Sequence, residues 1–409
     1  MKILYLHQYF NTPSMPGGTR SYEMAKRLVA SGHEVHMITS FREESETQDW
    51  FQTIEDGINV HWLPVFYSNK LSYTQRIKAF FAFAFASARK AASLPADIIF
   101  ATSTPLTIAI PGVYASRRQK IPMVFEVRDL WPDLPIAIGA LRNPLLKFAA
   151  KKLERFAYRN AQRIIALSPG MTAGVEATGY PAKLISTIPN SCDLDLFTPD
   201  KEKGKRFRQE HPELGAGPIV LYPGTLGKVN GVGYLAELAA KVYTLRPDCR
   251  FVIVGAGLEW ANVKQLATKL GVLEKNFFMY EQVPKQKLAE VFCAASLVVS
   301  VVIDLPELEA NSANKFFDGL ASGTAVAINH GGWQADLIDK YRVGLCLSRD
   351  VDVAAQSLVN FLNDDEKVIH CGLNARGLAE SQFSRDALAK NMENVLREAV
   401  DGRDFRGKK

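Results

Sequence analysis

The chain has 409 residues, 47% of them apolar and 22% charged, a composition typical of globular proteins and unlike that of fibrous or disordered chains. This length exceeds what one compact core usually holds, so we expect two domains. Residues 1–195 contain 22 Lys or Arg against 16 Asp or Glu, an excess of +6 that equals the formal net charge of the whole chain. The first half is therefore the part expected to meet an acidic partner.

Three further features bear on the compartment. The five cysteines lack the short spacings of metal ligands, which favours a reducing, cytoplasmic compartment; they are Cys192, Cys249, Cys293, Cys346 and Cys371. The opening KILYLH runs into a strand-like segment without a cleavage site, so we expect no secretory signal. The most apolar helical stretch, residues 79–88, is only half of the ~20 residues that a bilayer span needs. We therefore expect a cytoplasmic protein that does not cross a membrane.

Short β-rich runs alternate with helical patterns along the chain, six in each half. The runs of the first half are Ile3–Leu6, Val35–Thr39, Val60–Leu63, Ile98–Thr102, Met123–Val127 and Ile164–Leu167. The runs of the second half are Ile219–Tyr222, Phe251–Val254, Phe277–Tyr280, Leu297–Val302, Ala325–Ile328 and Gly344–Leu347. Apolar strands separated by helices predict an α/β fold with two Rossmann-like, doubly wound parallel-sheet domains in tandem.

Breaks in periodicity and clustered charges place a domain boundary within residues 188–205. We expect an N-terminal domain over residues 1–193, a second domain over residues 194–380, and a C-terminal helix and tail over residues 381–409. Ligands of open parallel sheets bind outside the carboxyl ends of the strands, so the two domains are expected to face a central cleft.

A glycine loop follows the first strand. Pro16, Gly17 and Gly18 precede a predicted helix over Thr19–Ser31. Adjacent glycines permit positive φ and a close approach of the backbone to a ligand, and the helix start supplies unpaired N–H groups. A plain turn is the alternative interpretation.

The most basic part of the chain is Lys70–Arg163, with 16 basic against 5 acidic residues. Within it, Lys70–Ala92 and Leu141–Arg163 mix cations with bulky apolar side chains. Basic amphipathic helices of this kind lie in the bilayer interface, so an anionic membrane surface is the expected partner. The alternative is a core helix with a solvated basic rim. Nucleic acid is not expected, because no binding motif accompanies the charge.

Charged residues also end a strand of the first half, in the segment EVRDLWPD. Arg128 and Asp129 come directly after the predicted strand Met123–Val127. Such residues at the carboxyl end of a parallel strand are more often functional than structural, so both are candidates for the chemistry.

Two glycine loops of the second half follow strands directly. The segment YPGTLGKVNG supplies Gly224, Thr225 and the cation Lys228, which is placed to neutralise phosphate. The segment VGAGL supplies Gly255 and Gly257, but the third glycine of the dinucleotide fingerprint is absent, which disfavours a nicotinamide enzyme. A solvated lysine and simple turns are the alternative interpretations.

The segment NSANKFFDGLASGTAV is the most specific signal. Asn311, Ser312 and Asn314 are expected to cap a short helix that begins near Lys315. A cation beside free amides forms an anion site, and Asp318, one turn on, would accept hydrogen bonds from sugar hydroxyls. The arrangement suits a nucleotide diphosphate and its ribose, although Asp318 could instead be a surface residue of the helix.

Together these segments resemble a known family. The chain is most similar to retaining GT-B glycosyltransferases of the large sucrose-synthase-like family 4, among them the bacterial O-antigen and capsule enzymes that include L-fucosamine (FucNAc) transferases. The resemblance covers about residues 1–400 and rests on PGGTRSYEMAKRL, EVRDLWPD, ALSPGM, IPNSCDLDLF, YPGTLGKVNG, VGAGLE and NSANKFFDGLASGTAV.

The resemblance implies a UDP-sugar donor held mainly by the C-terminal domain, with neither metal nor other cofactor. It implies an undecaprenyl-diphosphate-linked saccharide as the acceptor and an enzyme that is peripheral on the inner face of the cytoplasmic membrane. It also implies that the final helix, about Arg385 to Ala399, crosses back to the first domain.

Some positions depart from the family pattern. The usual pair of glutamates falls on Ala310 and Asp318, so Asp318 keeps the ribose role while the first acid is missing, with Glu309 one place away. The usual Arg and Lys of the second-domain glycine loop fall near Thr225 and Asn230, so Lys228 is expected to supply that charge.

No acid and base pair stands out, which suits retention by front-face attack, in which the departing diphosphate takes the proton of the acceptor. Lys228, Lys315 and the amides near Gly17 and Asn314 are expected to stabilise that diphosphate. Arg128 stands where many members have a His.

Two alternatives remain at this point. A UDP-sugar 2-epimerase of the same fold would need carboxylates or histidines that converge for proton abstraction. A non-enzymatic, two-lobed protein that binds a sugar nucleotide is the other alternative, and as a solute receptor it would need an export signal.

Overall fold

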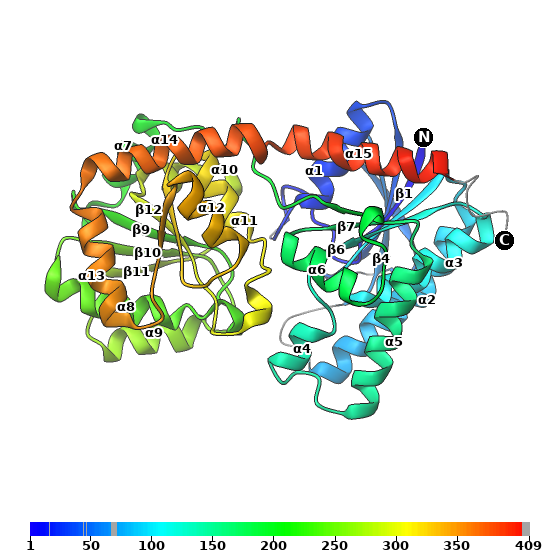
Figure 1. Ribbon diagram of the computed structural model, residues 1–409, viewed down its shortest axis with the longest axis horizontal. Coiled ribbons are helices and arrows are strands. Elements are labelled where there is room, and N and C mark those ends of the chain that lie inside the picture. Colours follow the sequence, from blue (N-terminus) through cyan, green and yellow to red (C-terminus); the bar gives the residue numbers. More distant parts are fainter. Residues whose placement is uncertain (16, 44, 46, 67–71, 403–409) are drawn as a thin grey trace. The chain divides into compact units, whose positions relative to one another are not determined.

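The computed structural model describes residues 1–402, with residues 16, 44, 46 and 67–71 left out. Pro16 of the predicted glycine loop and Lys70 of the predicted basic segment lie outside these described residues. The chain divides into two compact units, one formed by Met1–Pro189 with Asp386–Lys409 and the other by Asn190–Arg385 (Figure 1). Among the described residues, no helix is both long and apolar enough to span a membrane.

The N-terminal unit is built on a sheet of eight strands in the order β3-β4-β2-β1-β5-β6-β7-β8. The strands are β1 (Lys2–Leu6), β2 (Glu34–Phe41), β3 (Phe51–Glu55), β4 (Ile58–Pro64), β5 (Ile98–Thr102), β6 (Met123–Val127), β7 (Arg163–Ala166) and β8 (Ile185–Thr187). Neighbours pair in parallel except β3 and β4, which are antiparallel. β5 and β6 are buried at every residue, as expected of strands covered on both faces.

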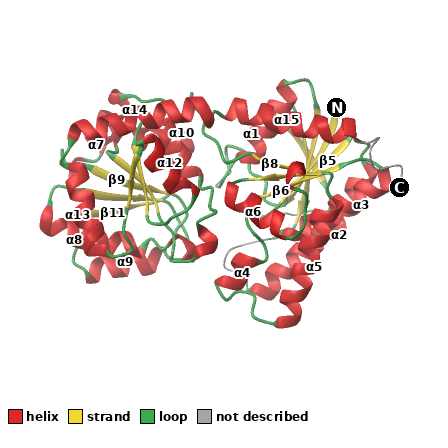
Figure 2. Ribbon diagram, viewed as in Figure 1, coloured by secondary structure: helices red, strands yellow, loops and turns green. Residues whose placement is uncertain are grey.

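Helices lie on both sides of these strands (Figure 2). They are α1 (Arg20–Ala30), η1 (Leu106–Ile108), α2 (Tyr73–Ser93), α3 (Ala109–Gln119), α4 (Asp133–Ala137), α5 (Pro144–Asn160), α6 (Pro169–Ala177), η2 (Ala182–Leu184) and α15 (Arg385–Asp401). Local sequence sets two of their starts. Ser72 and Gln75 form a capping box before α2, and Asn143 accepts from the first amides of α5, which has Pro144 at its first position.

The second unit has a sheet of six parallel strands in the order β11-β10-β9-β12-β13-β14. They are β9 (Ile219–Pro223), β10 (Arg250–Val254), β11 (Phe277–Tyr280), β12 (Leu297–Ser300), β13 (Ala325–Ile328) and β14 (Gly344–Cys346). β9, β12 and β13 are buried at every residue. The sheet therefore forms the centre of the core of this unit.

The helices of the second unit also lie on both sides of its sheet (Figure 2). They are α7 (Lys201–Glu210), η3 (Pro212–Leu214), η4 (Lys228–Asn230), α8 (Gly233–Leu245), α9 (Trp260–Lys269), α10 (Lys285–Ala294), η5 (Pro306–Leu308), α11 (Asn314–Ala321), α12 (Trp333–Tyr341), α13 (Val351–Leu362) and α14 (Asp365–Gln382).

This architecture confirms the predicted fold class of two doubly wound α/β sheets. Each of the twelve predicted runs coincides with a strand, but β3 and β8 were not predicted. β3 is an edge strand in which exposed and half-buried residues alternate, and β8 has only three residues, none of them buried. Neither contains the apolar run on which the prediction depended.

Among the parallel strands of each sheet, the strand order reverses at one point. It lies between β1 and β5 in the first unit and between β9 and β12 in the second. Ligands of doubly wound sheets bind next to this point, outside the carboxyl ends of the strands. The loops after these four strands are therefore where binding groups should be sought.

The last helix, α15, is tied to the first unit by a buried acid. Glu393 Oε1 lies 3.0 Å from Nε2 of His33, and both side chains are only 2% exposed. The Nδ1 of the same His33 lies 3.1 Å from the amino group of Met1. Burial alone would raise the pKa of Glu393, but hydrogen bonds from Lys390, Arg397 and His33 outweigh burial and lower the pKa to about 2.

We predict that Glu393→Ala lowers the free energy of unfolding by about 1.5 to 3 kcal/mol, because His33 loses a charged hydrogen-bond partner inside the protein. A lowered pKa means that the contribution is present above the usual pKa of 4.5 and is lost as the pH falls towards 2. Urea denaturation at pH 7 measures the loss. The control is Glu398→Ala, because the side chain of Glu398 is 56% exposed. Equal effects of the two changes would contradict this account of α15.

Candidate functional site

Lys315 lies at the switch point of the second sheet. It is the second residue of α11, after Asn314, and its Nζ donates to Tyr222 Oη at 3.1 Å and sits 4.3 Å from the centroid of the Tyr222 ring. Tyr222 Oη in turn donates to the Thr225 carbonyl at 2.7 Å, which turns the lone pairs of the hydroxyl towards the lysine. One buried tyrosine at the end of β9 thus fixes the position of the ammonium.

Glycines make room for this arrangement. Gly224 has a φ of 136°, and a Cβ there would lie 3.1 Å from Lys315 Cε. A Cβ at Gly255 would lie 1.8 Å from the Gly224 carbonyl oxygen, and one at Gly257 would lie 2.3 Å from the Leu226 carbonyl oxygen. The loops after β9 and β10 therefore touch backbone to backbone, which gives all three predicted glycines a packing role in holding the site.

The predicted capping of α11 by polar side chains is wrong. The N-cap residue is Ala313, and no side chain caps the helix. The Ser312 hydroxyl accepts from the Asn190 amide at 3.1 Å, and the Asn311 carbonyl accepts from Trp333 Nε1 at 2.8 Å. These residues therefore anchor the loop before the helix. The first amides of α11 keep no side-chain partner among the described residues, which leaves the positive end of the helix open to an anion.

The charge of Lys315 is unbalanced in this part of the structure. No carboxylate of the described residues pairs with its ammonium, and burial lowers its pKa from 10.5 to about 8. Lys315 is half-buried, and partial burial of a cation without a counter-charge makes its charged form less favourable. A bound anion would remove that cost, so the arrangement is suited to a negatively charged ligand.

Asp318 lies one turn further along α11 and is 8% exposed. Burial raises its pKa to about 6; Lys285 and Arg385 oppose this rise, and Asp193 adds to it. Both cations bind Asp193, at 2.7 and 2.9 Å, so their charge is shared between two acids. Asp318 Oδ1 has no hydrogen-bond partner in the described structure. A buried oxygen of this kind is suited to accept from a hydroxyl group.

The structure does not bring the remaining predicted residues of this unit into contact with Lys315 through their side chains. Lys228 begins η4 and is exposed, and no hydrogen bond or ion pair joins its ammonium to another residue that the structure describes. Thr225 contributes its carbonyl to Tyr222, while the residue itself is exposed. The structure thus brings Lys315 and Gly224 together and leaves Lys228 apart from them.

A second cluster gathers at the strand ends of the first unit. Arg128 Nη1, after β6, lies 3.3 Å from His7 Nε2, after β1. Burial, with Arg128 and Arg42 adding to it, lowers the pKa of His7 well below 6.5, so the ring is neutral and Nε2 accepts from the guanidinium. Asp129 Oδ2 accepts from Thr104 Oγ1 at 3.0 Å, and burial raises the pKa of Asp129. The two predicted residues therefore have neutral neighbours after β1 and β5.

The glycine loop of the first unit is held by one asparagine. Gly17 has a φ of 123°, and a Cβ there would lie 2.6 Å from Asn11 Nδ2. The same nitrogen donates to the Gly18 carbonyl at 3.2 Å. α1 begins at Arg20, and its N-cap residue Thr19 makes no side-chain cap. The backbone at this helix start is therefore shaped by packing against Asn11.

Sequence reasoning missed the buried ion pair behind this loop. Arg20 donates to Glu126 Oε1 from Nε at 3.2 Å and from Nη2 at 2.9 Å, with side-chain exposures of 2% and 0%. Arg20 also donates to the Pro189 carbonyl at 2.7 Å, and Glu126 Oε2 accepts from Thr102 Oγ1 at 2.5 Å. The pair joins the start of α1, the ends of β5 and β6, and the end of the N-terminal segment. No local signal identifies it, because its partners lie 106 residues apart.

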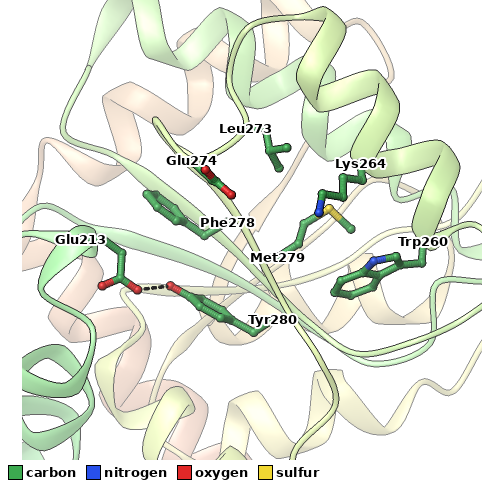
Figure 3. A pocket seen from close by; sticks show the side chains of 8 residues that line it. All are labelled: Glu213, Trp260, Lys264, Leu273, Glu274, Phe278, Met279 and Tyr280. Atoms are coloured by element: carbon green, nitrogen blue, oxygen red, sulfur yellow. Dashed lines mark hydrogen bonds between the residues drawn. The ribbon is translucent and has the colours of Figure 1, made fainter.

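A cavity of about 340 Å³ lies beside β11, the edge strand of the second sheet (Figure 3). Its lining side chains are Glu213, Trp260, Lys264, Leu273, Glu274, Phe278, Met279 and Tyr280. β10 separates β11 from β9, and none of the predicted site residues lines this cavity. Within the described ranges, no three His, Cys, Asp or Glu side chains are grouped so that they could hold a metal ion.

Two family models match the chain, one over each half. The Glycosyl transferase 4-like domain matches residues 17–191, and the Glycosyl transferases group 1 model matches residues 204–378. The first match includes Gly17, Gly18, Arg128 and Asp129. The second includes Lys315, Asp318 and the glycines after β9 and β10.

Individual relatives are distant but cover most of the chain. A GDP-mannose-dependent alpha-(1-6)-phosphatidylinositol monomannoside mannosyltransferase of Mycobacterium tuberculosis is 24% identical over 306 residues, which cover 73% of this chain and 74% of the relative. N-acetyl-alpha-D-glucosaminyl L-malate synthase of Bacillus anthracis is 23% identical over 403 residues, covering 96% and 97%. Among solved structures, Anabaena HepE in complex with UDP and glucose has a TM-score of 0.72 at 18% identity, covering 97% of this chain and 100% of that one. This structural likeness supports the fold alone.

We predict that Arg20→Met lowers the free energy of unfolding by about 3 to 5 kcal/mol, because the Glu126 carboxylate is left buried without its counter-charge. Adding Glu126→Gln to that variant removes the stranded charge and should recover part of the loss. Urea denaturation of the single and double variants measures both effects. A loss of unfolding free energy below about 1 kcal/mol, which is typical of exposed pairs, would contradict a stabilising role for the buried Arg20–Glu126 ion pair.

Proposed function

We propose that the protein transfers a sugar from UDP to a lipid-linked saccharide. The basis of the proposal is that the chain belongs to the family 4 glycosyltransferases of the GT-B fold. The sugar is an N-acetylhexosamine such as L-FucNAc, and the acceptor is carried on undecaprenyl diphosphate in O-antigen or capsule biosynthesis. Both follow from the resemblance of the motifs in the sequence. Because both family models describe glycosyl transferases, we prefer a transferase to the two alternatives, an epimerase and a non-enzymatic binding protein.

One observation carries the donor part of this proposal: the Lys315 side chain is half-buried, fixed by Tyr222 and without an acid partner among the described residues. Beside it, the start of α11 is uncapped and Gly224 leaves space for a close approach. A diphosphate would receive hydrogen bonds from the ammonium and from the free amides. The ribose hydroxyls would then donate to Asp318, one turn further into the helix.

The same groups would act on the leaving group. In the proposed reaction the bond between the anomeric carbon and the diphosphate oxygen breaks, and a bond to the acceptor oxygen forms on the same face of the sugar. The proton of the acceptor hydroxyl passes to the departing diphosphate. Lys315 would stabilise the negative charge that develops on that diphosphate, which is a role for a cation held in a fixed position.

The relatives support a nucleotide sugar and a lipid-borne acceptor in outline. Anabaena HepE is described in complex with UDP and glucose, and the M. tuberculosis relative is named for GDP-mannose and a phosphatidylinositol mannoside, which is a lipid. The choice of UDP over GDP in this chain therefore rests on the resemblance of its motifs. Arg128 and Asp129, after β6 of the first unit, are proposed to take part in the reaction.

We predict that Lys315→Ala weakens UDP binding about ten- to hundredfold at pH 7, the loss expected when one charged hydrogen bond is removed. Burial lowers the pKa of Lys315 to about 8, so the wild-type affinity should fall as the pH rises through 8, while that of Lys315→Ala should stay flat. Titration calorimetry at pH 7, 8 and 9 measures both effects.

The matched control for this prediction is Lys340→Ala. Lys340 is an exposed lysine of the same unit, and its ammonium also lies over a tyrosine ring, 5.0 Å from the centroid of Tyr341. This change should leave the affinity for UDP unaltered. Equal binding by the wild type and Lys315→Ala would remove Lys315 from the diphosphate site.

We also predict that transfer, or the slow hydrolysis of the donor sugar, continues in excess EDTA, because Lys315 and the amides of α11 supply the positive charge that a divalent ion would otherwise provide. UDP release from UDP-GlcNAc, UDP-GalNAc and UDP-FucNAc, followed with and without EDTA, measures this and ranks the donors. Loss of turnover with EDTA and its return with magnesium would contradict the proposed metal-free mechanism.

A further inference from the structure

The outer side of α2 carries an apolar stripe flanked by cations. Lys78, Phe81, Phe85 and Arg89 are exposed and follow one another at helical spacing, with Phe81 39% and Phe85 62% exposed. The two rings stack with centroids 6.0 Å apart, so they form one apolar patch. Phe83 of the same run is buried in the core at 1% exposure. The run is thus divided between the interior and the surface.

α5 repeats this pattern. Leu145 and Phe148, at its start, are 78% and 64% exposed, and Lys152, Arg155 and Arg159 continue the same side of the helix. The Lys152 ammonium lies 5.3 Å from the centroid of the Phe148 ring. A cation beside an exposed aromatic ring can keep its charge in water while the ring enters an apolar phase.

α3 joins the two stripes into one surface. It packs against both α2 and α5, and Figure 1 shows the three helices side by side. Tyr114, Arg117 and Arg118 of α3 are exposed, and the Arg117 guanidinium lies 6.0 Å from the ring of Phe156 on α5. We call this surface the basic apolar face. Its members are Lys78, Phe81, Phe85, Arg89, Tyr114, Arg117, Arg118, Leu145, Phe148, Lys152, Arg155, Phe156 and Arg159.

The charge of these helices has one sign. α2, α3 and α5 together contain eleven Lys or Arg and one acid, Glu154, which is buried at 2% exposure. A solvated helix surface usually mixes both signs, because opposite charges at helical spacing stabilise it. An unmixed basic surface with exposed aromatic and aliphatic side chains instead matches a partner that is both anionic and apolar.

We propose that the basic apolar face docks on an anionic phospholipid bilayer, with Phe85, Leu145 and Phe148 in the headgroup region and the cations among the lipid phosphates. The bilayer interface is the surface that combines negative charge with an adjacent apolar phase. Exposed aromatic rings could stack on bases, but nucleic acid offers no apolar phase to cover the exposed aliphatic side chains of Leu145 and Leu146. This inference goes beyond the proposed transfer, since docking requires neither donor nor acceptor.

The test is sedimentation of the full chain with vesicles of phosphatidylcholine alone or with phosphatidylglycerol. The wild type should bind the anionic vesicles at least about tenfold more tightly and should be released by salt, because screening weakens the attraction. Replacing Lys78, Arg89, Lys152 and Arg155 by Ser should reduce the affinity at least about tenfold and flatten its dependence on salt. Replacing Phe85 and Phe148 by Ser should weaken binding while leaving the salt dependence in place.

Matched controls come from the second unit. Ile369 and Leu373 on α14 are 61% and 66% exposed, so their replacement by Ser removes a similar exposed apolar surface. The control for charge replaces four exposed lysines of the second unit by Ser: Lys269, Lys275, Lys287 and Lys340. Both control variants should bind vesicles like the wild type. UDP affinity should be the same in every variant, which separates failure of docking from failure of the donor site.

Three outcomes would overturn the proposal. The wild type could fail to distinguish anionic from neutral vesicles. The variants of the basic apolar face could bind as the controls do. The chain could bind single-stranded RNA tightly through the same cations while ignoring vesicles, which would assign the charge to a different partner.

Discussion

The proposed donor site of the second unit depends on one unbalanced charge. Lys315 is held at the end of β9 by Tyr222, with no acid of the described residues to neutralise it. Burial lowers its pKa to about 8, so at neutral pH the site contains an ammonium that is ionised at a cost in free energy. An anion that binds there relieves this cost. In the proposed reaction, this charge would attract the diphosphate of the donor before any contact with its sugar.

The packing around Lys315 explains why so many small residues lie close to it. Gly224, Gly255 and Gly257 let two loops approach until backbone meets backbone, and a side chain at any of these positions would enter occupied space. The tyrosine hydroxyl is oriented by the Thr225 carbonyl in the loop that follows. The cation is therefore positioned by rigid neighbours, which is what electrostatic stabilisation of a leaving group requires.

Local sequence patterns were sufficient for the fold and for parts of the site. Apolar runs predicted twelve of the fourteen strands, because buried parallel strands are continuously apolar, whereas β3 and β8 lack such a run. The spacing around Lys315 predicted a cation at a helix start. The partners of these residues could not be predicted. Tyr222 lies 93 residues from Lys315, and Arg20 lies 106 residues from Glu126. The predicted capping of α11 was wrong for the same reason, since Ser312 is taken by Asn190, 122 residues away.

The central claim is that Lys315 is a half-buried cation without a counter-charge, placed to bind an anion. Heteronuclear NMR of the lysine side-chain ammonium, titrated with pH in the free protein and with UDP, measures this directly. The account predicts a pKa near 8 in the free protein and a clear rise when UDP binds, because the diphosphate favours the charged form. An ordinary pKa, about 10.4, that does not move with UDP would contradict it.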